Sequence, residues 1–440
     1  MLSLIKNEFI KIFKRPKTWI VFTLFIALVG INIFGTWKND QTMREWISPE
    51  YQIKQAEEQL TYIRNDIKRA EADGDQNWLN SSKEIEKNLL KQIEDNKEII
   101  KNGISEESWK KDLEQTIKDL EIKVESYEEN GINEWNKRWY AQSKQELEDY
   151  KYLRDNNIMP LQGWEYTEAN FFRNLGSFFR FGLLIAGIAV FMSDMVSGEC
   201  TPATLKFLLV QPVKRGKILF SKFIVSLVTV TSLIVLPQLA GMAIVNITSN
   251  TEVSNYPVRI EQKYEKQFDQ NSQEMILEQV PNTSKMVTNN EFILRSIGYQ
   301  IIFIATACSV VFMISTIFKS SMISMAVSVI LTMFLTIGAQ AIGTLRDYSH
   351  FLFTTYADAG SVINSSLPLM YQNTNLTIMN GLICMTITSI IAYIVSHINF
   401  SKKRYFNLII IDFIIIYPHS KKVINKSITK IRLLLITFSF

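Results

Sequence analysis

Residues 297–342 read IGYQIIFIATACSVVFMISTIFKSSMISMAVSVILTMFLTIGAQAI, and Lys319 is the one charged residue among them. Uncharged runs on either side of it cover residues 297–318 and 322–342. A helix needs an apolar run of about 18 or more residues to cross a bilayer. The stretch therefore predicts two membrane-spanning helices that are joined by a short turn.

Further apolar runs extend this pattern along the 440-residue chain: residues 19–37, 176–192, 223–247 and 378–396. The run 19–37 has tryptophan at both ends, which suits the two headgroup regions of a bilayer. A secretory signal peptide is the alternative for it, but the run is long for one and no A-x-A cleavage site follows. We predict an all-α, polytopic membrane protein with about six transmembrane helices.

Residues 1–18, MLSLIKNEFIKIFKRPKT, predict a cytoplasmic amphipathic helix that lies in the membrane interface. Its apolar side chains share one helical face, and its lysines lie largely on the other. The two sets are Leu2, Leu4, Ile5, Phe9, Ile12 and Phe13, and Lys6, Lys11, Lys14 and Lys17. Pro16 is expected to break or bend the helix before the first span.

Residues 38–170 are polar and predict a large extracytoplasmic helical insertion, coiled-coil-like, between the first and second spans. Apolar residues recur there at steps of three and four, as in a heptad seam. They include Ile53, Ala56, Leu60, Ile63, Ile67 and Ala70, and later Leu113, Ile117, Leu120 and Val124. Interruptions at Gly74, Gly103 and Gly131 indicate helices folded back as antiparallel hairpins in one compact bundle or stalk. The alternatives are one long solvated helix or a disordered charged linker.

Lysine and arginine gather near the span ends in four groups: residues 6–17, 206–222, Lys319 and 402–404. In a six-span chain all four groups fall on one side of the membrane, which the positive-inside rule makes cytoplasmic. We therefore expect a multi-pass protein of the cell membrane, in the bacterial plasma membrane, with both termini cytoplasmic. The insertion and the polar loop 248–290 then lie outside.

The transmembrane domain is expected to cover residues 171–400 and to contain five helices. Its segment 345–376 has little charge and includes HFLFTTY and LPLMY, which favours a re-entrant or interfacial helix pair. Residues 401–440 are expected to form a cytoplasmic or interfacial tail. The sequence after Arg404 fits either an interfacial hairpin or a shifted reading frame.

The segment between the second and third spans, residues 193–222, reads SDMVSGECTPATLKFLLVQPVKRGKILFSK. Thr201 can cap a helix that has Pro202 at its first position and continues through residues 204–210. A short helix at the membrane surface, joined directly to two spans, can transmit a push from a soluble partner. The alternative is an ordinary cytoplasmic loop that is basic because of the positive-inside rule.

This segment resembles the cytoplasmic coupling loop of ABC-2 type exporter permeases. That loop runs from a glutamate through Gly-Thr, a leucine pair and a proline to a basic residue and a lysine. Within residues 194–222 the matching positions are Glu199, Thr204, Leu208, Leu209, Pro212, Arg215 and Lys222. Ala203 stands where the family usually has glycine, and the core family does not share the heptad block.

The resemblance implies the permease subunit of an ABC-type exporter, whose partners are a separate ATP-binding subunit, a second permease copy or paralogue, and the lipid bilayer. The sequence has no G-x4-G-K-[ST] phosphate loop, so we expect ATP to be bound and hydrolysed by the partner. We expect no catalytic, cofactor-binding or metal-ligating residues in this chain, and no nucleic-acid partner.

The expected function is export of a hydrophobic or amphipathic substrate such as a peptide antibiotic, drug or lipid. The alternative is a non-transporting signal transmitter, whose extracytoplasmic helical domain acts on a cell-wall enzyme or ligand. A membrane-tethered coiled-coil scaffold would need one span only and leaves the other five unexplained.

Overall fold

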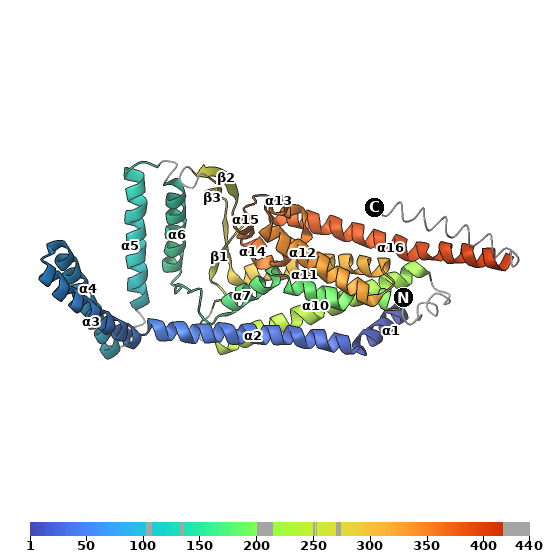
Figure 1. Ribbon diagram of the computed structural model, residues 1–440, viewed down its shortest axis with the longest axis horizontal. Coiled ribbons are helices and arrows are strands. Elements are labelled where there is room, and N and C mark those ends of the chain that lie inside the picture. Colours follow the sequence, from blue (N-terminus) through green and yellow to red (C-terminus); the bar gives the residue numbers. More distant parts are fainter. Residues whose placement is uncertain are drawn as a thin grey trace.

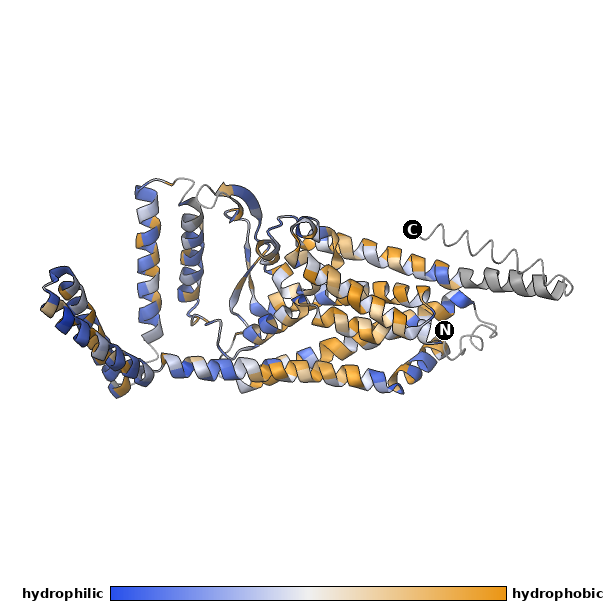
Figure 2. Ribbon diagram, in the orientation of Figure 1, coloured by the Kyte–Doolittle hydropathy of each residue, from blue (hydrophilic) through white to orange (hydrophobic). Residues whose placement is uncertain are grey.

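The computed structural model describes residues 1–102, 108–132, 136–199, 214–249, 251, 253–269 and 274–416, which are mainly helical. Among them, five helices are long and apolar enough to cross a membrane. These are α2 (Pro16–Ile47), α10 (Arg215–Thr248), α11 (Asn289–Ile317), α12 (Ser321–Ala341) and α16 (Ile378–Ile416). They form one bundle (Figure 1), and Figure 2 shows that its helices are predominantly apolar.

The second predicted span, residues 176–192, is not one straight helix. It falls on α7 (Glu168–Arg180) and α8 (Leu183–Met192), whose axes are bent by 62°. Gly182 lies at the break with a φ of +92°, a conformation that glycine adopts without steric cost. The bent pair makes a sixth crossing if it is counted as one span. The apolar composition continues across the break and therefore did not reveal it.

The N-terminal helix α1 (Leu2–Phe13) is separated from α2 by a sharp turn, as expected from Pro16, which is the first residue of α2. Thr18 Oγ1 donates a hydrogen bond to the Ile12 carbonyl across this turn, at 2.7 Å. Glu8 and Ile12 of α1 are buried. Helix α1 packs against α10 and is therefore part of the bundle, at its polar end.

The insertion contains four helices: α3 (Pro49–Asp73), α4 (Gln76–Asn102), α5 (Ser108–Glu129) and α6 (Lys137–Asp155). They pair as two hairpins, α3 with α4 and α5 with α6, and each hairpin has its own apolar core. Gly74 ends α3 in the left-handed conformation. The hairpins follow the sequence prediction, but the two of them do not pack into one compact bundle, because one partner helix is enough to cover each narrow seam. Figure 1 shows α3 and α4 beyond the end of α2, apart from α5 and α6.

The polar loop 248–290 contains strands, which the all-α prediction did not include. They are β1 (Pro257–Ile260), β2 (Tyr264–Asp269), β3 (Glu274–Gln279) and β4 (Lys285–Thr288). β1 pairs antiparallel with β4, and β2 pairs antiparallel with β3. Such short strands give a weak sequence signal, because they depend on cross-strand pairs and on packing against a neighbour. Here β3 packs against α6, and β1 and β4 pack against α11.

The sequence predicted a re-entrant or interfacial helix pair at residues 345–376. In the structure this region forms short helical segments that cover the end of the bundle next to the strands. They are α13 (Gly343–Asp347), η2 (Ser349–Phe351), η3 (Phe353–Ala357), α14 (Ala359–Ile363) and α15 (Leu367–Tyr371). Tyr356 and Tyr371 are fully buried there. The Asn373 amide donates to the carbonyls of Arg346 and Asp347, which satisfies backbone acceptors at the end of α13. The segment 345–376 is therefore packed against the rest of the protein.

Candidate functional site

A buried group of charges lies at the end of the bundle where the N-terminus is found (Figure 1), and it includes the described start of the α8–α10 connection, residues 193–199. Lys222 Nζ donates to Glu199 Oε1 at 2.5 Å and to Glu8 Oε2 at 2.9 Å. Lys222 is 3% exposed, and both carboxylates are buried. We refer to Glu8, Lys11, Glu199 and Lys222 as the Lys222 cluster.

Helix α10 positions Lys222 on its buried face. The residue lies two turns after the start of the helix at Arg215, and Ile218, Leu219 and Val225 of the same face are buried with it. Residues three and four apart lie on one side of a helix, so the spacing of this set directs the ammonium group inward.

Glu199 is held by the short helix η1 (Ser197–Glu199). The backbone N–H groups of Val196 and Ser197 donate to Ser315 Oγ of α11, at 3.0 and 3.1 Å. On the other side, Ser324 Oγ of α12 donates to the Ser193 carbonyl at 2.6 Å. These bonds fix the start of the α8–α10 connection against two neighbouring helices.

Helix α1 supplies the other two members of the cluster. Lys11 Nζ lies 3.2 Å from Glu8 Oε1 and 3.8 Å from Glu199 Oε1. The Lys11 side chain is 44% exposed, so its ion pairs are screened by solvent and contribute little to stability. Burial alone would raise the pKa of Glu8, but the Lys222 and Lys11 ammonium groups hold this pKa below its usual value.

The Lys222 cluster is balanced in charge, with two carboxylates and two ammonium groups. A balanced buried cluster recovers part of its desolvation cost through its own ion pairs, whereas removing one member leaves a charge without compensation. A further contact reinforces the same junction, because Lys17 Nζ lies 3.0 Å from Asp194 Oδ1. The charges therefore join α1, the start of α2, η1 and α10.

A family model described as ABC-2 family transporter protein matches residues 2–405. The chain belongs to the ABC-2 transporter family. Membership makes it a membrane component of an ABC transporter and implies an ATP-binding partner, as the resemblance of the loop predicted. No curated protein and no solved structure matches the chain.

The structure brings together two of the residues that carried the ABC-2 resemblance, Glu199 and Lys222. Arg215 is the first residue of α10 and is not a member of the cluster. The remaining predicted site residues, Thr204, Leu208, Leu209 and Pro212, lie outside the described residues.

Sequence reasoning missed Glu8 and Ser315. Glu8 had a signal, since it is the one acidic residue in the first 39 positions and interrupts an otherwise basic helix. A lone carboxylate among lysines on an interfacial helix suggests a buried cationic partner. Ser315 had no such signal. A serine that accepts hydrogen bonds from a distant turn cannot be told apart, in an apolar run, from any other serine of that run.

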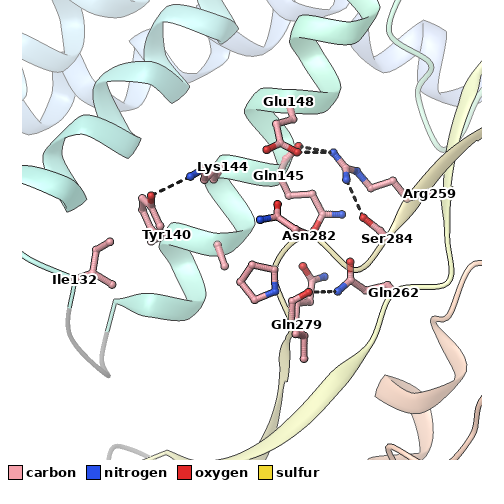
Figure 3. A pocket seen from close by; sticks show the side chains of 13 residues that line it. Ile132, Tyr140, Lys144, Gln145, Glu148, Arg259, Gln262, Gln279, Asn282 and Ser284 are labelled. Carbon is pink, nitrogen blue, oxygen red and sulfur yellow. Dashed lines mark hydrogen bonds and ion pairs between the residues drawn. The ribbon is translucent and has the colours of Figure 1, made fainter.

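A polar cavity of 460 Å³ lies at the opposite end of this ABC-2 protein, between α6 and the strands (Figure 3). Arg259 of β1 reaches α6, where its Nε donates to Asp149 Oδ1 at 2.6 Å and its Nη2 lies 3.3 Å from Glu148. Its Nη1 also donates to Ser284 at 2.9 Å. Arg259 thus attaches the α5–α6 hairpin to the strands.

The lowered pKa of Glu8 gives the cluster a defined pH dependence. A carboxylate whose pKa is lower in the folded state contributes stability above its unfolded value, here about 4.5, and loses it as pH falls through the folded value. We expect Glu8→Gln to lower the melting temperature of the full chain in detergent at pH 7. The difference from the parent protein should begin to shrink below about pH 4.5.

The matched control is Glu45→Gln, which replaces an exposed glutamate outside the cluster. Its melting temperature should follow that of the parent protein throughout the titration. A Glu8→Gln difference that stays constant to pH 3 would contradict the assignment.

Proposed function

We propose that this ABC-2 protein is the permease subunit of an exporter. In this proposal a separate ATPase subunit hydrolyses ATP, and the permease exports a hydrophobic or amphipathic substrate such as a peptide antibiotic, drug or lipid. The observation that supports coupling is the Lys222 cluster, because it attaches the α8–α10 connection to α1 and α10 through buried charges. The connection is the part of the chain that resembles a coupling loop.

Force applied to the connection would reach several helices at once. Glu199 passes it to α10 and α1 through Lys222 and Glu8, and Ser193 passes it to α12 through Ser324. Ser315 adds α11 to the same set. In our proposal, an ATPase that binds residues 204–212 displaces these helices together and so changes the substrate path.

The arrangement of the bundle also supports the proposed orientation. The N-terminal helix, residues 193–199 and the α11–α12 turn lie at one end, and the two hairpins and the strands lie at the other (Figure 1). We assign the first end, which has the basic groups, to the cytoplasm of a bacterial cell. The hairpins then face outward, as an extracytoplasmic domain.

We further propose that two permeases assemble, as copies or paralogues. Helix α2 exposes large apolar side chains along its length, including Ile20, Leu24, Ile31 and Phe34. Such a face needs contact with lipid tails or with another apolar helix. A second permease that packs beside α2 would supply that contact and complete a path between two bundles.

Replacing Leu208 and Leu209 with aspartate tests the coupling role of the loop. We expect the ATPase subunit to be lost from the purified complex, because an apolar docking pair has become charged. Membrane insertion should be unaffected, since the loop lies outside the spans. The measurements are co-purification of the ATPase and the ATPase rate, which should fall at least tenfold.

The control for added charge is Leu90→Asp, which alters an exposed leucine on α4 at the far end of the molecule. It should leave ATPase binding intact. Unchanged co-purification and unchanged transport in the Leu208/Leu209 variant would overturn the coupling role.

A non-transporting signal transmitter is the second candidate, and one observation favours it. The α3–α4 hairpin extends from α2, and its core is separate from the cores of the bundle and of the α5–α6 hairpin. An outlying hairpin of this kind suits contact with another protein. Substrate efflux from vesicles distinguishes the two functions, since a transmitter moves no substrate.

A further inference from the structure

A second cavity, of 630 Å³, lies between the bundle and the outer part of the chain. We name it the arginine cavity, because Arg173 and Arg180 of α7 and Arg259 of β1 all line it. Its remaining wall includes Phe172, Phe292 and Leu153, which are buried apolar side chains. The cavity thus combines a cationic part with an apolar part.

Two of the three arginines already have anionic partners. Arg259 pairs with Asp149 at 2.6 Å, and Arg180 Nη1 lies 3.7 Å from Asp358 Oδ2. The charged residues of the lining are these three arginines and two aspartates, and Arg259 also contacts Glu148, just beyond the lining, at 3.3 Å.

Arg173 differs from the other two arginines in its contacts. Within the described part of the chain its guanidinium forms no ion pair, and its side chain remains exposed while lining the cavity. A guanidinium presents five donors in a planar fork that suits carboxylate and phosphate groups. Arg173 is therefore available to an anion from outside the protein.

The position of the cavity selects among anions. Figure 2 shows the change from the apolar bundle to the polar outer part at the level of α7 and β1, two elements that line the cavity. A small soluble anion at Arg173 would leave the apolar lining residues Val258, Met286 and Met370 uncovered. An amphiphile places its headgroup at Arg173 and its apolar part against these side chains, which removes apolar surface from water.

We propose that the arginine cavity binds an amphiphile with an anionic phosphate headgroup, held by Arg173. The inference deepens the proposed export function, since it assigns the substrate or a regulatory lipid to this chemical class. Binding itself requires neither ATP nor the partner subunit, so it can be tested whether or not the chain exports anything.

The test uses the full chain, immobilised in an uncharged detergent, and radiolabelled dioleoyl phosphatidylglycerol as the probe. Unlabelled phosphatidylglycerol should compete for the site, with phosphatidylcholine at least tenfold weaker and glycerol phosphate without effect. Arg173→Gln should reduce the retention of labelled phosphatidylglycerol about tenfold or more, since a hydrogen bond to a charged group is lost. Arg173→Lys should restore part of the retention.

The control is Arg346→Gln, because Arg346 lies at the same end of the bundle, in α13, and does not line the cavity. Its retention should equal that of the parent protein, and the circular dichroism of all variants should be unchanged. Equal retention by Arg173→Gln, equal competition by phosphatidylcholine, or full competition by glycerol phosphate would each overturn the proposal.

Discussion

Replacing Lys222 with methionine is expected to lower the free energy of unfolding by about 3–5 kcal/mol, the cost of breaking a buried ion pair by removing one partner. Glu8 and Glu199 would then share a buried site in which Lys11 is the cation that, among the described residues, still contacts both. We also expect coupling to the ATPase to be lost, because Glu199 of η1 would no longer be held against α10 by its ion pair with Lys222. The measurements are thermal stability in detergent and ATP-driven transport in reconstituted vesicles.

Two further variants make this prediction specific. Lys217→Met removes an exposed lysine from the first turn of the same helix and should change neither stability nor transport. Adding Glu199→Gln to Lys222→Met removes one of the two facing carboxylates and should recover part of the lost stability. Additive losses in the double variant would show that Glu199 and Lys222 do not interact.

Replacing Gly381 with alanine should prevent α16 from packing in its native position. An added methyl group would overlap the Tyr299 hydroxyl and would lie 2.7 Å from the Tyr356 ring. Both tyrosines are buried, with Tyr356 fully so, and a ring that moves aside must therefore displace its packed neighbours. Overpacking of this kind costs about 1–3 kcal/mol and occasionally more, and we expect a value at or above the upper end. Size-exclusion chromatography after heating would measure the loss.

Gly298→Ala provides the matched control, since Gly298 also lies within a helix, in α11, and an added methyl group would meet no atom within 4 Å. Alanine favours helix more than glycine does, so stability should stay the same or rise slightly. Equal heat resistance of the two variants would show that α16 does not approach α11 and η3 as closely as in the structure.

Helix positions in the bundle could be predicted because apolar run length is a local property. The runs 223–247, 297–318 and 322–342 each lie on one helix, α10, α11 and α12. The bend at Gly182 and the pairing of β1 with β4 depend on distant neighbours. The separation of the two hairpins is also non-local, since a heptad seam does not identify the helix that covers it.

The candidate site also has one part that local sequence predicts and another that depends on the fold. Glu199 and Lys222 follow a spacing that resembles a known loop, so sequence alone could identify them. The contact of Lys222 with Glu8 joins residues 214 positions apart and requires α1 to dock on α10. An amphipathic pattern predicts that α1 lies near a membrane surface, but it does not specify which helix receives its one carboxylate.

Helix α2 has a mechanical consequence because it runs for 32 residues without a break. At 1.5 Å per residue it is about 48 Å long, well beyond the roughly 30 Å thickness of the hydrocarbon core. At its start, Lys17 of α2 pairs with Asp194, and at its far end Ser48 leads directly into α3. It is therefore a lever arm: a tilt of about 5° at the base displaces the far end by about 4 Å.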